Sequence, residues 1–395
     1  MSYKSKSDKS HYKRLGDYIE LVDQRNEDLA IDVLLGLSIS KEFIPSVANT
    51  IGTNMKKYKI VHKNQFACSI MQVRRDGKMP VAILKTYDKA IISQAYPVFK
   101  VKDESVLNPD YLMMWFKRKE FDREATFHAV GGVRGSLEWE DFMSFKLPVP
   151  PIEKQRQIVA EYNAVDNRIR INEQLNQKLE ETAQAIYKEW FVYNHNDFNE
   201  NFQLKEFGSI ITGKTPSSKN PEDFGNKMPF VTPGDFNASQ KFILDSNRRL
   251  SKIGFGKLQN KILPEGSILV TCIGSDMGKV AVVNMDCITN QQVNSIVVNH
   301  SYFSDYLFYT LNHISEEKIK GIAMGSSTMP MLNKSDFEKI EIKNPKDSIL
   351  KKFEEELSPI NKQLIKRQEE NYKLSELKDL LLSKMSKVEV EKEMI

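Results

Sequence analysis

Glycine-rich and acidic segments are the places where this sequence could carry catalytic chemistry. The segment "IGSDMGKV" (273–280) approaches a phosphate-binding loop, but only three residues separate its glycines and Val280 follows the lysine. A turn between two strands explains it better. The sequence contains neither G-x-G-x-x-G nor an aromatic-flanked Pro-Pro pair of the adenine-methyltransferase type, and its acidic residues form no convincing nuclease triad. We therefore expect no catalytic and no cofactor-binding residue.

Cysteine and histidine positions give no metal-binding pattern. Cys68, Cys272 and Cys287 are too few for a disulfide framework, and no Cys-x-x-Cys or Cys/His spacing predicts a zinc site. His300 and His313 are too far apart for a helical metal pair, so we interpret the histidines as structural or solvated. Buried thiols in a reducing cytoplasm are the expected state.

Basic residues within predicted turns are the candidates for binding an anion. Arginine suits bidentate contact with guanine and lysine suits phosphate, although each of these side chains could equally be an ordinary solvated charge. Glycines beside Arg134 in "GGVRG" would let the backbone approach a phosphate closely. The candidates are Arg74, Arg75, Lys78, Arg134, Lys214, Lys219, Arg248, Arg249 and Lys279.

Length and composition are those of a multi-domain protein of ordinary polarity. The 395 residues suffice for two or three domains, and the formal net charge of +4 is too small to indicate nucleic-acid binding by itself. No apolar run approaches the roughly 20 residues of a membrane span, and the polar, basic N-terminus shows no signal peptide. We expect a cytoplasmic protein without a membrane partner.

The sequence repeats itself once. "WEDFMSFKLPVPP" (139–151) aligns with "KSDFEKIEIKNPK" (334–346) at an offset of 195 residues, and the register continues downstream. A weaker match relates "YKRLGDYIELV" (12–22) to "LKEFGSIITGK" (204–214) at an offset of 192. The predicted order is a first globular domain (1–151), a central helix (152–195), a second globular domain (196–346) and a C-terminal helix (347–395).

Both globular segments read as mixed α/β domains, so the predicted fold class is α+β. Short Val- and Ile-rich runs alternate with turn residues, for example "MPVAIL" (79–84) and "GSILVTCI" (266–273). Capped apolar segments at 108–122 and 302–315 predict short helices between the strands.

The two long segments instead have apolar residues at alternating steps of four and three, the pattern of an antiparallel coiled-coil pair. The centre of each is polar, which would fix register and orientation, or would simply face water where two shorter helices meet. The predicted helix-pair core consists of Ile158, Tyr162, Val165, Ile169, Asn172, Asn176, Leu179, Ile186, Phe353, Leu357, Ile360, Leu364, Arg367, Asn371, Leu374 and Leu381.

The Pro-rich segment "LPVPP" (147–151) ends the first domain, because proline has no N–H and restricts the residue before it. A helix starting near Ile152 would run about 60 Å at 1.5 Å per residue. Two helices of this length would hold two similar domains at a fixed separation about an approximate twofold axis. Duplex DNA, read at two half-sites, is the ligand that this arrangement suits.

At this point the chain resembles the specificity subunits of Type I restriction–modification enzymes. Residues 147–192 resemble the family's central spacer helix, and "ITGKTPSSKNPEDFGNKMPFVTPGDF" (211–236) is similar to its opening recognition motif, with Phe224 and Phe230 where tryptophan is usual. Residues 131–142 and 325–337 resemble the paired segments before each helix. The entry to the C-terminal helix lacks the usual proline-rich, glutamine-containing sequence.

The resemblance implies a non-catalytic subunit that reads an asymmetric bipartite DNA site. It implies two methyltransferase subunits, which carry S-adenosylmethionine, and motor–nuclease subunits that use ATP and Mg. Adenine N6 lies inside the base stack, so the methylating partner would flip the base. The alternatives are a coiled-coil adaptor that binds proteins, without the steep salt dependence of DNA binding, and an enzyme with an unrecognised active site.

Overall fold

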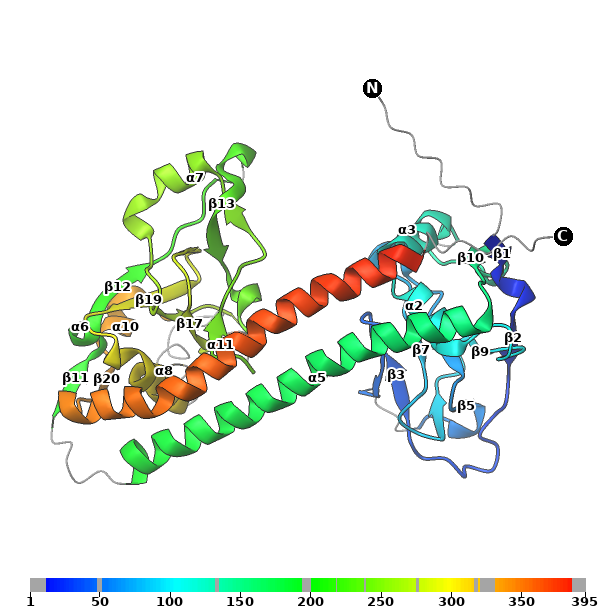
Figure 1. Cartoon of the computed structure of the whole chain (residues 1–395), viewed down its shortest axis with the longest axis horizontal. Coiled ribbons are helices and arrows are strands. Elements are labelled where there is room, and N and C mark those ends of the chain that lie inside the picture. The colour runs from blue at the N-terminus through cyan, green and yellow to red at the C-terminus, as the bar shows by residue number, and fades with distance from the viewer. Residues whose placement is uncertain are drawn as a thin grey trace. The chain divides into compact units, whose positions relative to one another are not determined.

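The structure is a computed structural model that describes residues 12–47, 52–131, 135–193, 200–217, 219–237, 239–274, 277–315, 319 and 331–385. Its contacts divide the chain into two compact units, Met1–Arg168 with Leu374–Ile395, and Ile169–Lys373. Each unit contains one mixed α/β domain and a stretch of each of two long helices, α5 (Ile152–Lys188) and α11 (Asp347–Lys384) (Figure 1).

The main sheet of unit 1 has four antiparallel strands in the order β2-β9-β6-β7. These strands are β2 (Ile19–Val22), β9 (Val98–Val101), β6 (Phe66–Cys68) and β7 (Val81–Ile83). Three further antiparallel pairs complete the unit: β1 (Tyr12–Arg14) with β10 (Lys146–Pro148), β3 (Leu35–Leu37) with β4 (Phe43–Pro45), and β5 (Lys59–His62) with β8 (Lys89–Ile92). Its helices are α1 (Val73–Asp76), α2 (Pro109–Phe116), α3 (Lys119–His128) and α4 (Trp139–Ser144).

The helical segment predicted at 108–122 is two helices, α2 and α3. The Asn108 side chain caps α2, and Pro109 occupies its first turn. The chain then turns at Arg118, whose backbone is extended (φ −72°, ψ 141°). The Arg118 guanidinium lies 4.0 Å from the centre of the Trp115 ring, and this contact holds the break between the helices.

Unit 2 repeats the strand order of unit 1 and extends it. Its five-stranded sheet runs β12-β19-β16-β17-β14, so β12, β19, β16 and β17 correspond to β2, β9, β6 and β7. The strands are β12 (Gly208–Thr212), β19 (Val293–Val298), β16 (Ile268–Thr271), β17 (Val280–Val283) and β14 (Phe242–Ile243). β16 and β17 form an antiparallel hairpin, and its connection contains the segment that approached a phosphate loop in sequence.

A smaller layer in unit 2 has no counterpart in the order of the main sheet. It is a three-stranded sheet, β15 (Arg249–Leu250), β13 (Phe224–Val231) and β18 (Ile288–Thr289), with helix α7 (Lys252–Lys257) beside β13. Within unit 2 this layer lies at the end away from α8 (Tyr302–Ile314), which packs beside α11 (Figure 1). The unit is completed by β11 (Asn201–Gln203), α6 (Leu204–Phe207), α10 (Lys334–Glu338) and β20 (Glu341–Lys343).

Equivalent hydrogen bonds define the repeat more accurately than the sequence did. Leu15 N–H donates to the Phe145 carbonyl at 2.7 Å, and Leu204 N–H donates to the Ile340 carbonyl at 3.0 Å. The two acceptor residues, Phe145 and Ile340, keep the offset of 195 residues. The two donor residues, Leu15 and Leu204, are only 189 residues apart in sequence. The predicted offset of 192 at this end was wrong, because short motifs without gaps cannot place an insertion inside a domain.

Helix α5 begins directly after the Pro-rich segment and is held there by a buried glutamine. The Gln155 side chain is fully buried and donates to the carbonyls of Pro150 (2.7 Å) and Val106 (2.8 Å). Its Oε1 accepts from the Asn108 backbone N–H at 2.8 Å. In α11 the position 195 residues later is Leu350, which is fully buried in an apolar cluster. At this matched position α5 docks through polar contacts and α11 through an apolar side chain.

We predict that Gln155→Ala destabilises the chain by about 3 kcal/mol, because it leaves the Asn108 N–H and the carbonyls of Val106 and Pro150 without their side-chain partner. Chemical denaturation of the purified chain measures this effect. Gln157→Ala is the matched control, since the exposed Gln157 side chain bonds only to Lys154 and Glu161. Equal midpoints for the two variants would show that Gln155 does not anchor the helix.

Candidate nucleic-acid interface

Two of the candidate basic residues of unit 1, Arg74 and Arg75, lie in the short helix α1, and Lys78 follows two residues after it. α1 follows Gln72, whose left-handed backbone (φ 64°) turns the chain sharply after β6. Arg74, Arg75 and Lys78 are all exposed. Arg75 forms an ion pair with Asp76 at 2.6 Å, and this hydrogen bond lowers the pKa of the Asp76 carboxyl. In the part of the chain that the structure describes, the Arg74 guanidinium has no ion pair, so it is the better placed of the two for a ligand.

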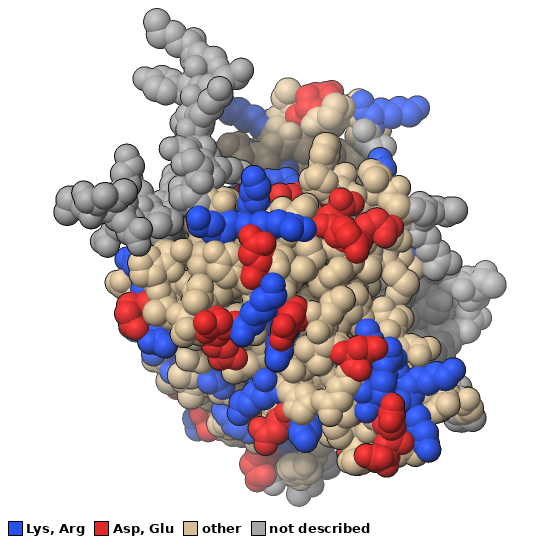
Figure 2. Space-filling view, turned by 90° about the vertical axis from the view of Figure 1, so that its right-hand side faces the viewer, with Lys and Arg blue, Asp and Glu red and all other residues tan. Residues whose placement is uncertain are grey.

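Arg134, the fourth candidate of this domain, lies outside the described residues. Figure 2 shows one face of unit 1, on which Lys and Arg side chains alternate with Asp and Glu over a largely uncharged surface. This face therefore carries no broad field of one sign, and DNA binding here would depend on individual side chains.

The first basic segment of unit 2 is fixed at the end of β12. A Cβ on Gly213 would lie 2.3 Å from the carbonyl oxygens of Thr289 and Asn290, so only glycine permits this close approach. Lys214 N–H donates to the Thr289 carbonyl at 2.9 Å, and the Thr215 hydroxyl bonds to Gln291 Oε1 at 2.6 Å. These contacts hold the backbone in place, while the side chains of Lys214 and Lys219 are exposed.

Two adjacent arginines of unit 2 have different surroundings. Arg249 in β15 is ion-paired with Asp245 at 2.6 Å. Arg248 is exposed, and its guanidinium carbon lies 4.3 Å from the centre of the Phe224 ring. Lys279 is half-buried in the β16–β17 connection and lines a pocket. The structure thus separates charges that are already paired from charges available to a ligand, a distinction that sequence spacing does not contain.

The predicted helix-pair core is placed as follows in unit 2. Phe353, Leu357 and Leu364 of α11 are buried in one apolar cluster, and Leu179, Ile186 and Ile360 pack against it partly buried. Ala183 and Tyr187 of α5 are buried in the same cluster. Arg367 is half-buried, and the buried residue at this level is Gln368, whose side chain donates to the Phe242 carbonyl at 2.9 Å.

A polar layer crosses the helix pair in unit 2. Asn172 Nδ2 donates to Asn371 Oδ1 at 2.9 Å and to Glu370 Oε2 at 3.1 Å, and Ile169 is half-buried beside it. Asn172 and Asn176 are buried, so neither faces water. A buried amide pair restricts register, because sliding the helices would leave its donors unpaired.

The helix pair continues in unit 1 with a mixed core. Tyr162, Leu382 and Met385 are buried in one cluster, and Ile158 packs against it. Lys378 of α11 forms an ion pair with Asp166 of α5 and lies over the Tyr162 ring. The predicted positions Val165, Leu374 and Leu381 are half-buried, and the buried neighbour of Leu381 is Leu382.

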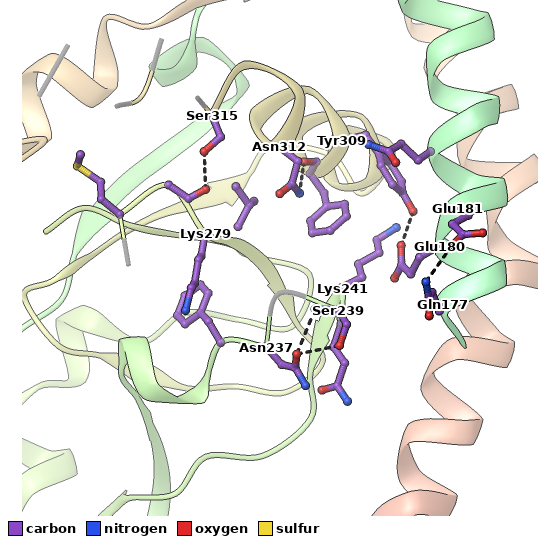
Figure 3. Close-up of a pocket in the computed structure, with 17 residues that line it drawn as sticks. Gln177, Glu180, Glu181, Asn237, Ser239, Lys241, Lys279, Tyr309, Asn312 and Ser315 are labelled. Atoms are coloured by element: carbon purple, nitrogen blue, oxygen red, sulfur yellow. Dashed lines mark hydrogen bonds between the residues drawn. The ribbon is translucent and has the colours of Figure 1, made fainter. Parts of the chain in front are cut away.

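A pocket of about 720 Å³ in unit 2 lies between α5, α8 and the β16–β17 connection (Figure 3). Its polar wall contains Glu180, whose carboxylate accepts from the Tyr309 hydroxyl at 3.1 Å. Burial raises the pKa of the Glu180 carboxyl, and the charge of nearby Lys241 only partly opposes this shift. Lys241 is itself paired with Asp305 at 2.5 Å.

Further chemistry can be stated only for the described residues. Cys68, Cys272 and Cys287 are free and buried, and burial raises the pKa of the Cys272 and Cys287 thiols to about 12. No cluster of three or more His, Cys, Asp or Glu side chains in the described ranges could hold a metal ion. Across the same ranges, no helix is both long and apolar enough to cross a membrane.

Comparison with known proteins finds several relatives of a single class. The family described as "Type I restriction modification DNA specificity domain" matches twice, at residues 16–181 and 196–374. The Type I restriction enzyme HindI specificity subunit of Haemophilus influenzae is 26% identical over 389 residues, covering 77% of this chain and 82% of that protein. The MjaIX specificity subunit of Methanocaldococcus jannaschii is 31% identical over 145 residues, covering 36% of this chain and 33% of that protein.

The fold has a solved counterpart. The S subunit of the Type I restriction–modification system of M. genitalium matches with a TM-score of 0.58 at 14% identity, covering 98% of both chains. The two family matches fall on the two repeated parts that the strand order defines. The chain belongs to the family of Type I restriction modification DNA specificity domains, and the resemblance inferred from sequence is confirmed.

Three structurally important polar residues were not singled out in the sequence: Gln155, Lys241 and Gln368. Each is buried and bonded to residues far away in the chain. Gln155 and Gln368 lie in polar stretches of helix where apolar periodicity gives no signal. For Gln155 alone, the sequence offered a sign of this buried role, because the glutamine closely follows a proline-rich helix start.

We predict that Glu180→Gln removes a pH dependence from the stability of the chain. A raised pKa means that the folded state holds the proton more tightly, so this stability is complete below the ordinary pKa of 4.5 and is lost as pH rises through the raised value. Glutamine keeps the acceptor for Tyr309 and does not ionise. The variant should match wild type at low pH and exceed it at neutral pH, as measured by thermal unfolding from pH 4 to 8.

The neighbouring Glu181 provides the matched control. It is exposed, and hydrogen bonds from Lys178 and Gln177 lower the pKa of its carboxyl. Glu181→Gln should therefore lose a little stability at neutral pH and approach wild type as pH falls. A stability difference for Glu180→Gln that does not vary with pH would contradict the burial argument.

Proposed function

We propose that the chain reads a split, asymmetric DNA sequence with one half-site for each recognition domain. The observation that carries this proposal is the shared strand order β2-β9-β6-β7 and β12-β19-β16-β17, on which the two domains display different loops and different basic side chains. Among the candidate arginines that the structure describes, Arg74 in the first domain and Arg248 in the second have no ion pair. Two similar scaffolds with different contacts recognise two different base sequences.

Methyltransferase subunits are the first proposed partners. α5 exposes Ile171 and Leu175 by 42% and 43% one turn apart, and α11 exposes Tyr372 by 45% in the same unit. In unit 1, α11 exposes Leu377 and Leu380 as well. Apolar side chains at helical spacing on paired helices suit a partner that adds further helices. Because the chain is built from a repeat, we propose two such subunits, one for each half of the repeat.

The chemistry of the proposed complex belongs to its partners. The methyltransferase subunits would bring S-adenosylmethionine and methylate adenine at N6, and motor–nuclease subunits would use ATP and Mg. A base must leave the stack to be methylated at N6, so the recognition domains would hold the flanking sequence while the partner flips the adenine. The role of this chain is to select the site, which agrees with its family.

Adenine-methylation mapping by single-molecule sequencing tests the proposed function. DNA from cells that express the chain with its cognate methyltransferase should contain one new methylated motif with two separated, unequal halves. Cells with the methyltransferase alone provide the control, and the motif should be absent from them. If an active methyltransferase gives no split motif in the presence of the chain, the protein does not select DNA sites.

The spacer between the half-sites provides a second test. α5 and α11 are both continuous, and we propose that their length sets the tolerated spacer. Deletion of one heptad from each helix removes about 10 Å of helix at 1.5 Å per residue while preserving the apolar pattern. The mapped motif should keep both halves and change its spacer. If the truncated protein still directs its methyltransferase to sites with the original spacer, this role of the helices is refuted.

A further inference from the structure

Arg248 is held over an aromatic surface in the small layer of unit 2. Its guanidinium carbon lies 4.3 Å from the centre of the Phe224 ring and 5.7 Å from that of Phe230. The two rings meet edge to face, with centres 6.1 Å apart and planes inclined at 73°. Stacking fixes the plane of a guanidinium while leaving the N–H groups at its rim available for hydrogen bonds.

The backbone beneath Arg248 is fixed as well. Its carbonyl accepts from the Phe230 N–H at 2.9 Å and from the Ser246 hydroxyl at 2.7 Å. Pairing of β15 with β13 continues directly afterwards, with Arg249 opposite Pro229. Both ends of the Arg248 side chain are thus positioned before any ligand binds, which reduces the rotamer entropy that binding would otherwise cost.

The neighbouring Arg249 already uses N–H donors within the domain. Arg249 is bound to Asp245 through Nη1 at 2.6 Å and to the Asn226 carbonyl through Nε at 3.3 Å. This ion pair occupies Asp245, the nearest acidic residue in sequence. Within the described ranges Arg248 has no ion pair, so its charge and its donors remain for a ligand.

A purely structural role would explain part of this arrangement. Phe230, Leu250, Leu258 and Ile288 form a small apolar cluster, and the stem of Arg248 lies at its edge. Covering an apolar edge requires only a long side chain, and methionine would cover it equally well. An exposed guanidinium over the Phe224 ring, with no ion pair among the described residues, is not needed for that purpose.

We propose that Arg248 reads a guanine in the half-site recognised by the second domain, with Phe224 and Phe230 orienting it. The proposal rests on the proposed function and specifies the contact. A planar guanidinium donates two parallel hydrogen bonds to guanine O6 and N7 in the major groove, and this contact requires a fixed plane. Phosphate contacts tolerate flexible side chains, and the exposed Lys227 and Lys252 in the same layer are suited to them.

The experiment compares Arg248→Met and Arg248→Lys with wild type by methylation mapping of cells that contain the cognate methyltransferase. Methionine preserves the apolar cover and lysine preserves the charge, but neither has the planar fork. Both variants should lose the preference for guanine at one position of one half-site. Methylation of sites with another base there, relative to guanine, should rise roughly 5- to 100-fold. All positions of the other half-site should remain as in wild type.

Arg249→Met and Arg74→Met are the matched controls. Arg249→Met should retain the guanine, because Arg249 is already paired, and Arg74→Met should leave the half-site that Arg248 affects unchanged. An unaltered motif in both Arg248 variants would overturn the proposal in favour of a structural role. Equally weakened methylation of every site would overturn it in favour of a phosphate contact.

The outcomes also separate this inference from the proposed function. A wild-type chain that gives no split motif refutes the proposed function, whereas a wild-type motif that persists in the Arg248 variants refutes only the guanine contact. If Arg248→Met abolishes all methylation, the motif of Arg248→Lys decides whether Arg248 contacts guanine, because lysine preserves both the length and the charge of the side chain.

Discussion

A charged group without access to water must find its partners inside the protein, and the second recognition domain is organised around such a group. The Lys241 ammonium is buried, and it bonds to Asp305 of α8 and to Asn361 of α11. Asn361 in turn donates to both carboxylate oxygens of Asp305. Displacing α11 would remove the Asn361 amide from both buried ions, so the recognition domain favours one position of this helix. Gln155 imposes the same kind of constraint on the first domain and α5 without a charge.

Apolar periodicity was enough to predict both long helices, the strand-rich domains and the repeat, because those features depend on which residues face a core. It could not assign the buried polar residues. Gln368 and Arg367 are adjacent polar residues in α11, yet Gln368 is buried because the Phe242 carbonyl lies opposite it. Leu381 and Leu382 are likewise adjacent and both apolar, yet Leu382 is buried and Leu381 is only half-buried. Which of two neighbours turns inward depends on the partner surface, and a single sequence does not contain that surface.

At the candidate interface, too, the sequence identifies the basic residues but not their ion-pair partners. Arg74 and Arg75 are indistinguishable in sequence, as are Arg248 and Arg249. All four were predicted within turns, but Arg74 and Arg75 lie in α1 and Arg249 lies in β15, because turn residues flank these very short elements. Only the positions of Asp76 and Asp245 show which arginine of each pair is already neutralised. Phe224 and Phe230 first stood out as departures from the tryptophans usual in the family. In the folded domain they form the surface on which Arg248 lies.

The repeat also explains why the general function can be assigned while the recognised bases cannot. The four strands common to both domains, and the anchors to α5 and α11, are scaffold features that restrict many residues at once and therefore leave a clear pattern in sequence. Base recognition depends on a few side chains whose directions are set by local contacts. In the second domain those contacts belong to a layer outside the shared strand order. Under the proposed guanine contact, substitutions in that layer would change specificity without altering the strands shared by the two domains.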